Sequence, residues 1–135
     1  MSMAARGAPA EARLIRGRNR GLELLRATEA AALSVGRWLG RGDKAGTRDA
    51  GHMVMEEALT GMPFEGRIVI GPEGTSSRLL AGRTIGAGRD RVDLAVLPVD
   101  GISLVAGGLS QALSVAAVAE TGGILLPPPV AYMHK

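Results

Sequence analysis

Residues 66–101 constrain the fold of this chain most, because they contain two apolar runs that each end in a turn of Gly and Pro with a single acid. The runs cover residues 67–70 and 92–97, and the acids that follow them are Glu73 and Asp100. Short β-branched runs between Gly and Pro are typical of strands. Many phosphate-handling folds hold metal ions with acids at the ends of strands, but Mg²⁺-assisted hydrolysis generally needs several converging carboxylates. One acid per turn is fewer than this chemistry needs.

Few large side chains are available to fill a core. The 135 residues suffice for one domain, and the only aromatic residues are Trp38, Phe64 and Tyr132, whereas Gly contributes 20 residues. An interior built from small side chains buries little apolar area, and an interface with another subunit would supply the missing area. We therefore expect a homo-oligomer, or a partner subunit that covers an exposed surface of this domain.

Composition argues against several classes of protein. Without cysteine the chain forms no disulfide framework and no thiolate metal site. No apolar run is long enough for a signal peptide or a membrane span, so we expect a cytoplasmic protein with no membrane partner. The formal net charge of +3 is concentrated in residues 1–20, which hold five Arg against one Glu. No interleaved aromatic residues or DNA-binding motif accompany them, so we expect a flexible basic tail and no nucleic-acid role.

Apolar side chains recur at helical spacing in two segments. Residues 19–39 carry them at spacings of three, four and seven, and a Gly-rich turn ends this predicted helix. Trp38, near its end, is predicted to plug the core rather than to stack on a ligand. A second helix is predicted over residues 47–59, with Thr47 as its N-cap and Gly51 as a residue that weakens it.

Beyond the two helices the pattern changes to short runs separated by Gly, Pro or Asp, which predict strands. The run at residues 113–119 also suits a helix by propensity, and we favour a strand because Gly122 and Gly123 follow it closely. The predicted strands cover residues 67–70, 79–85, 92–97, 103–106, 113–119 and 124–126. Two helices followed by strands predict an α+β fold, in which the helices pack on one face of a mixed or mostly antiparallel sheet.

Two further features bear on chemistry. The Gly-Arg-Gly-Asp-Lys segment that ends at Lys44 is predicted to lie between the helices, where its backbone N–H groups and the ammonium group could hold an anion. An ordinary charged loop would have the same sequence. Asp93 shares a strand face with Ala95 and Leu97 by alternation, which favours a buried or paired structural role.

Four segments occur in the order LLRATEAAALSVGRWLGRGDK, EGRIVIG, VDLAVLPVDG and YMHK. In this order and spacing they resemble the N-terminal half of class II fructose-1,6-bisphosphatases, some of which also have sedoheptulose-bisphosphatase activity. The resemblance covers residues 21–135, which we take as one domain. It implies the first α/β sandwich domain of a Mg²⁺- or Mn²⁺-dependent sugar phosphatase of the lithium-sensitive superfamily, usually oligomeric. The ligand-binding candidates that it supplies are Asp43, Lys44, Arg48, Gly101 and Tyr132.

The motifs depart from this family pattern where metal ligands are expected. Arg48 stands where the family has an Asp ligand, and the turn after the next strand keeps a single acid, Glu73. In the family's Asp-Pro-(Leu/Ile)-Glu-Gly-Thr signature, Leu97 replaces the first acid and Asp100 the second. Leucine removes a charge and an oxygen donor, and a guanidinium repels Mg²⁺. We therefore expect no metal, with Glu73 and Asp100 as the remaining candidate ligands, and Mg²⁺ or Mn²⁺ only if phosphatase activity persists.

The resemblance and the departures together predict a truncated homologue from carbohydrate metabolism, because the sequence ends at Lys135, directly after the family's Tyr-Met-Glu-Lys segment. The first predicted function is a pseudoenzyme. It would bind a phosphosugar or another anion through Lys44, Arg48 and Arg78, or would serve as an oligomeric assembly module. The alternative is an enzyme that acts on a sugar phosphate or a related metabolite, so enzymatic activity stays open.

Such an enzyme would use residual Mg²⁺- or Mn²⁺-dependent phosphatase chemistry, or acid–base chemistry without a metal. The candidate catalytic residues are Glu73, Asp93, Asp100 and His52. Because His52 precedes the apolar Met53, a histidine tolerated on the helix surface is favoured over a catalytic one. His134 is expected to be solvated.

Overall fold

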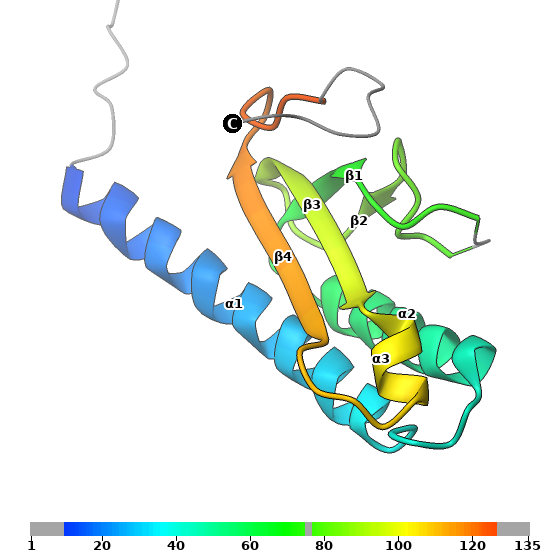
Figure 1. Ribbon diagram of the computed structural model, residues 1–135. Helices are drawn as coiled ribbons and strands as arrows, with labels where there is room; N and C mark the ends of the chain where they lie inside the picture. The colour runs from blue at the N-terminus through cyan, green and yellow to red at the C-terminus, as the bar shows by residue number, and fades with distance from the viewer. Residues whose placement is uncertain (1–9, 75–76, 127–135) are drawn as a thin grey trace, which may run out of the picture.

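The structure, a computed structural model, describes residues 10–74 and 77–126. Three helices and a four-stranded sheet lie within these ranges (Figure 1). No helix there has the length and the apolar character that a membrane span requires. In chain order the elements are α1 (Ala10–Gly36), α2 (Lys44–Thr60), β1 (Glu65–Ile70), β2 (Thr84–Ile85), β3 (Arg91–Asp100), α3 (Ile102–Ala106) and β4 (Leu113–Glu120).

The sheet has the strand order β2-β1-β3-β4 and mixes both strand orientations. β1 and β3 run parallel, whereas β2 pairs with β1 and β4 pairs with β3 in antiparallel orientation. Parallel neighbours end at the same edge of a sheet. The turn after β1 and the turn after β3 therefore lie at one edge, and the prediction of a mixed sheet is confirmed.

Both long helices pack against one face of this sheet, as Figure 1 shows. Alternate residues of β3, including Val92 and Leu94, face the helices and join their apolar side chains in one core. This one-sided helix layer confirms the predicted α+β fold. The buried members of the core are Leu24, Ala27, Ala31, Met55, Leu59, Met62, Phe64, Ile68, Leu79, Ile85, Val92, Leu94 and Val96.

A β-bulge interrupts each parallel strand near its C-terminal end. The register between β1 and β3 shifts between Ile68 and Ile70, and the register between β3 and β4 shifts between Leu97 and Asp100. The second bulge contains Pro98, which has no N–H to donate to a ladder and is tolerated at irregular positions. Bulges bend a strand and redirect the residues that follow. Both turns therefore leave the sheet from irregular backbone.

Glycines allow α2 to approach its neighbours closely. A Cβ at Gly51 would lie 2.5 Å from Cγ2 of Val99 and 2.9 Å from Cγ2 of Val35, which is too close for real atoms. The Trp38 ring packs over Gly46 in the first turn of α2, but it is only half-buried and joins neither core, so the predicted core plug is wrong. Gly51 therefore does not merely weaken α2, because its missing side chain is what lets the helix pack.

The predicted helix boundaries need correction. α1 begins at Ala10 rather than near residue 19, so half of the predicted tail is helical, and residues 1–9 lie outside the described ranges. The N-cap of α2 is Asp43 rather than Thr47, because the Asp43 carboxylate accepts a hydrogen bond of 2.8 Å from the Gly46 N–H. Thr47 is instead buried inside the helix, where its hydroxyl donates to the Asp43 carbonyl oxygen at 2.6 Å.

Three of the six predicted strands are confirmed, as β1, β3 and β4. In residues 79–85 only Thr84–Ile85 is a strand, and residues 124–126 form no strand. Residues 103–106 belong to helix α3, so the strand predicted there is wrong. The reason is the left-handed conformation of Gly101 (φ 94°), which turns the chain so that Leu104 and Val105 donate to its carbonyl oxygen. Val105 then packs with Val35 and Val99 in a second small core.

Replacing Gly51 with alanine tests the close approach of α2. Helix propensity alone would favour alanine by roughly 1 kcal/mol. Because the added methyl group meets Val99 and Val35, we expect Gly51→Ala to lower the free energy of unfolding by about 1–3 kcal/mol. The measurement is urea unfolding followed by circular dichroism.

Gly21→Ala is the matched control, because a Cβ at Gly21 in α1 meets no atom within 4 Å. This variant is expected to raise the free energy of unfolding by about 0.5–1 kcal/mol. Equal stabilisation by both substitutions would contradict the packing described for α2.

Candidate functional site

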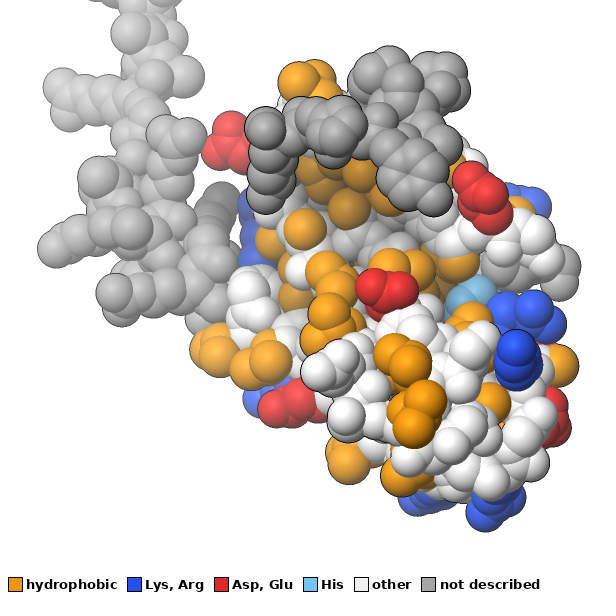
Figure 2. Space-filling view, viewed as in Figure 1, with side chains coloured by type: hydrophobic (Ala, Val, Ile, Leu, Met, Phe, Trp, Pro, Cys, Tyr) orange, Lys and Arg blue, Asp and Glu red, His pale blue; other side chains and the backbone are white. Residues whose placement is uncertain are grey.

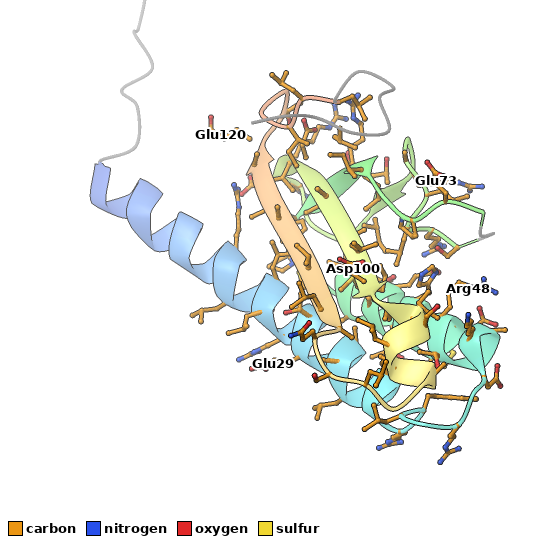
Figure 3. All side chains as sticks on the ribbon, viewed as in Figure 1. Glu29, Arg48, Glu73, Asp100 and Glu120 are labelled. Atoms are coloured by element: carbon orange, nitrogen blue, oxygen red, sulfur yellow. The ribbon has the colours of Figure 1, made fainter. Side chains whose placement is uncertain are left out.

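The two strand-end acids lie at the sheet edge where the parallel strands end, but they do not converge. Glu73 follows β1 in an exposed turn, and Asp100 is the exposed last residue of β3. Figure 3 shows Glu73, Asp100 and Arg48 at separate places around this edge. The parallel pairing therefore brings the two turns to one edge without bringing their carboxylates to one point.

The donor set at this edge does not fit a divalent cation. Among the residues that the structure describes, no group of three or more His, Cys, Asp or Glu side chains could hold a metal ion. Arg48, which the resemblance predicts to replace a ligand, has its Nε 3.4 Å from Oδ1 of the neighbouring Asp49. A guanidinium at this place opposes a cation, and Mg²⁺ requires near-octahedral oxygen ligands.

The Gly-rich loop between α1 and α2 uses its N–H groups within the protein. The Gly40 N–H donates to the Val105 carbonyl oxygen at 2.8 Å, and the Gly42 N–H donates to the Ala106 carbonyl oxygen at 2.9 Å. These groups are not available to an anion, contrary to the expectation from the sequence. The loop instead holds α3 in place.

The other ligand-binding candidates lie at different places in the fold. Asp43 caps α2, and Lys44 is exposed beside it. Gly101 forms the left-handed turn that starts α3. Tyr132 lies outside the described residues. A ligand-binding role of these residues stays a prediction.

Asp93 has the buried role that strand alternation predicted. Its side chain is buried on the sheet face opposite the helices, where Oδ2 accepts a 2.8 Å hydrogen bond from the Gly122 N–H. The Nε of Arg67 lies 3.9 Å from Oδ1, which accepts no hydrogen bond from the described residues. Asp93 thereby ties β3 to the turn after β4.

His52 is buried on α2, with 7% of its surface exposed, so the expected helix-surface histidine is wrong. Burial lowers the pKa of His52 below its ordinary value, and the nearby positive charge of Arg48 lowers it further. Asp49 and Glu56 oppose this shift more weakly. The imidazole is therefore neutral at neutral pH.

A concavity of about 600 Å³ lies between α2 and the segment that follows β1. Its lining is acidic, and Oε2 of Glu56 accepts a 3.0 Å hydrogen bond from the Arg78 N–H across it. A negative surface repels phosphorylated sugars. Sequence reasoning missed this site, although the spacing of Asp49, His52 and Glu56 along one helix face was a usable signal. The lining residues are Asp49, His52, Met53, Glu56, Glu57, Thr60 and Ser77.

Comparison with known proteins identifies the family. Residues 18–135 match the family described as bacterial fructose-1,6-bisphosphatase, glpX-encoded. The chain belongs to the class II fructose-1,6-bisphosphatases. It is 42% identical over 118 residues to fructose-1,6-bisphosphatase 1 class 2 of Escherichia coli (strain K12). It is 35% identical over 131 residues to the D-fructose 1,6-bisphosphatase class 2/sedoheptulose 1,7-bisphosphatase of Synechococcus sp. (strain JA-2-3B'a(2-13)).

These matches make the chain a partial homologue within the class II family. They cover 84% of this chain and 34% of the Escherichia coli protein, and 85% of this chain and 37% of the Synechococcus protein. The chain therefore spans about a third of the length of these curated relatives. The resemblance inferred from the four sequence segments is confirmed.

The burial of His52 predicts a pH dependence of stability. The unfolded chain protonates this side chain near pH ~6.5, whereas the folded state keeps it neutral to lower pH, so the unfolded state binds more protons below that value. We expect the free energy of unfolding to be highest above about pH 6.5 and to fall as the pH drops toward the lower folded-state pKa.

His52→Gln is expected to flatten this part of the profile, measured by urea unfolding at a series of pH values. His134→Gln serves as the control, because His134 is the other of the two histidines in the sequence. A slope that persists in His52→Gln and disappears in His134→Gln would show that the assignment is wrong.

Proposed function

We propose that this class II segment does not itself hydrolyse sugar bisphosphates and that it functions as an assembly module. The observation that carries the proposal is the setting of Leu97. This side chain replaces the first acid of the family signature and stands 38% exposed on the open sheet face, opposite Val115 of β4. A position that the resemblance assigns to metal chemistry thus belongs to an apolar surface.

The remaining polar groups support the first part of the proposal, that this segment does not hydrolyse sugar bisphosphates. Hydrolysis assisted by two metal ions needs carboxylates on both sides of a phosphoryl oxygen. Glu73 and Asp100 stand apart (Figure 3), and by the resemblance Arg48 stands where the family has an Asp ligand. The concavity of about 600 Å³ beside α2 has three carboxylates in its lining, and this negative charge repels a phosphorylated substrate.

The apolar surface supports the second part of the proposal, the role as an assembly module. Figure 2 shows hydrophobic side chains gathered in the middle of the open face, over β3 and β4. Contiguous exposed apolar patches mark interaction sites in soluble proteins. The partner would be a second copy or another subunit. The large exposed apolar side chains on and beside this sheet are Ile70 (39%), Leu97 (38%), Leu109 (59%), Leu113 (59%) and Val115 (46%).

A second candidate function rests on His52. A buried, neutral imidazole beside Glu56 in a concavity is the kind of group that acts as a general base. The alternative is therefore an enzyme that uses acid–base chemistry without a metal. Turnover that survives a chelator and disappears in His52→Gln would favour it.

A phosphate-release assay directly tests the proposal that this segment does not hydrolyse sugar bisphosphates. We expect no inorganic phosphate above background from fructose-1,6-bisphosphate in millimolar Mg²⁺ or Mn²⁺, because too few oxygen donors converge to hold the metal. The Escherichia coli class 2 relative is the positive control under identical conditions. Metal-dependent release that Asp100→Ala abolishes would overturn the proposal.

A further inference from the structure

We propose that the concavity beside α2 binds a linear polyamine, a molecule in which ammonium groups are separated by short chains of methylene groups. The concavity has a volume of about 600 Å³ and is lined by α2 and by the segment that follows β1. None of its lining residues belongs to the apolar sheet face proposed for assembly. The inference therefore goes beyond the proposed function and does not depend on it.

The charge of the concavity selects a cation. Asp49, Glu56 and Glu57 contribute three carboxylates, and the described lining includes no Lys or Arg. The chain as a whole has a formal net charge of +3, so this negative charge is local. A cleft lined by charges of one sign focuses the electric field and concentrates ions of the opposite sign.

The spacing of the carboxylates favours a ligand with several charges over a single metal ion. Asp49 precedes Glu56 and Glu57 by about two turns of α2, which is about 11–12 Å along the helix axis. Within the described part of the chain, no three metal-ligating side chains are grouped to hold an ion. A linear polyamine carries its charges along its length. Its methylene groups would lie on Met53, which is exposed between the carboxylates on the same helix face.

His52 gives an independent indication that the concavity holds a ligand. Its side chain lines the concavity, yet only 7% of its surface is exposed. No described residue forms a hydrogen bond with its ring nitrogens. Buried polar groups normally have partners, and a neutral imidazole has one acceptor nitrogen and one N–H donor. Because an ammonium group has three N–H donors, it can donate to the acceptor nitrogen of His52 and still reach a carboxylate.

The carboxylates nearest to His52 keep oxygens available for such a ligand. Glu56 follows His52 by one helical turn, and its side chain uses Oε2 to accept a backbone N–H at 3.0 Å, which leaves Oε1. Glu57 has no hydrogen bond or ion pair with the residues that the structure describes. Asp49 is partly neutralised, because the Nε of Arg48 lies 3.4 Å from its Oδ1. We therefore place one ammonium group between His52 and Glu56 and a second at Glu57.

Titration calorimetry with spermidine, a linear triamine, tests the inference on the intact chain. We expect one saturable site per chain in a buffer of low ionic strength, where charge pairs are least screened. Butylamine has a single ammonium group on an alkyl chain. It should bind about tenfold more weakly, because it lacks the ion pairs of the other ammonium groups, each of which contributes up to about fivefold.

Two glutamates supply a matched pair of variants. Glu57→Gln removes a charge from the concavity with little change of shape and is expected to weaken spermidine binding by about threefold to fivefold. Glu29→Gln makes the same change at an exposed residue of α1 (Figure 3) that does not line the concavity. Both variants change the net charge of the chain equally. The control should therefore change the affinity by less than about 1.5-fold.

His52→Leu tests the imidazole separately. Leucine keeps an apolar side chain at this buried position but accepts no hydrogen bond. We expect spermidine binding to weaken by about tenfold, the loss typical of a hydrogen bond to a charged group. Thermal unfolding shows whether each variant folds, and Glu57→Gln, which alters an exposed side chain, gives its result independently of His52→Leu.

Several results would overturn the inference. The absence of saturable spermidine binding removes the site. Equal weakening by Glu57→Gln and Glu29→Gln shows attraction by net charge alone. Displacement of spermidine by Mn²⁺ at matched ionic strength shows a metal site, and butylamine bound as tightly as spermidine shows a site for one ammonium group. Phosphate release and the oligomeric state do not enter this test, so its failure is distinct from failure of the proposed function.

Discussion

The parallel pairing of β1 with β3 is the constraint on which the rest of the structure depends. It brings the ends of two strands to one sheet edge, and the bulges at Ile68–Ile70 and Leu97–Asp100 then set the direction in which each turn leaves. The left-handed Gly101 starts α3, whose last carbonyls accept the N–H groups of the Gly-rich loop before α2. The turns that follow the two apolar runs therefore lie at one sheet edge. Glu73 and Asp100 at this edge are exposed and stand apart (Figure 3).

The small side chains have opposite effects inside and outside the core. Inside, Gly51 lets α2 touch Val99 and Val35, so the helix layer packs closely with few aromatic residues. Outside, the described residues leave part of the face opposite the helices exposed, including Leu97 and Val115, although Asp93 on the same face is buried. Leu97 lies on that face where the family signature has an acid. In the proposed function, this one substitution would both remove a metal ligand and add an apolar side chain to a contact surface, which joins the proposed loss of catalysis to the proposed assembly role.

Sequence patterns predicted the elements that depend on their own residues. β1, β3 and β4 follow from alternation and β-branching, the helix layer follows from helical spacing, and Asp93 was placed correctly by counting along β3. Tertiary contacts decided the rest. The residues of α3 have the sequence pattern of a strand, but they form a helix that starts at the turn of Gly101 and packs on Val35. The burial of His52 depends on how α2 meets the chain after β1. The positions of Glu73 and Asp100 at strand ends were predictable, whereas their separation in space (Figure 3) was not, because it depends on the path of each turn beyond its strand.

Metal binding tests the central claim most directly, because a retained site would bind Mn²⁺ whether or not it turns substrate over. A ligand that binds only the folded state stabilises it by about 2.7 kcal/mol at a hundred times its dissociation constant. The account predicts that millimolar Mn²⁺ leaves the melting temperature of the chain unchanged, while the Escherichia coli class 2 relative serves as the reference. A saturable rise in melting temperature that Asp100→Ala removes would contradict the claim that the scaffold has lost its metal chemistry.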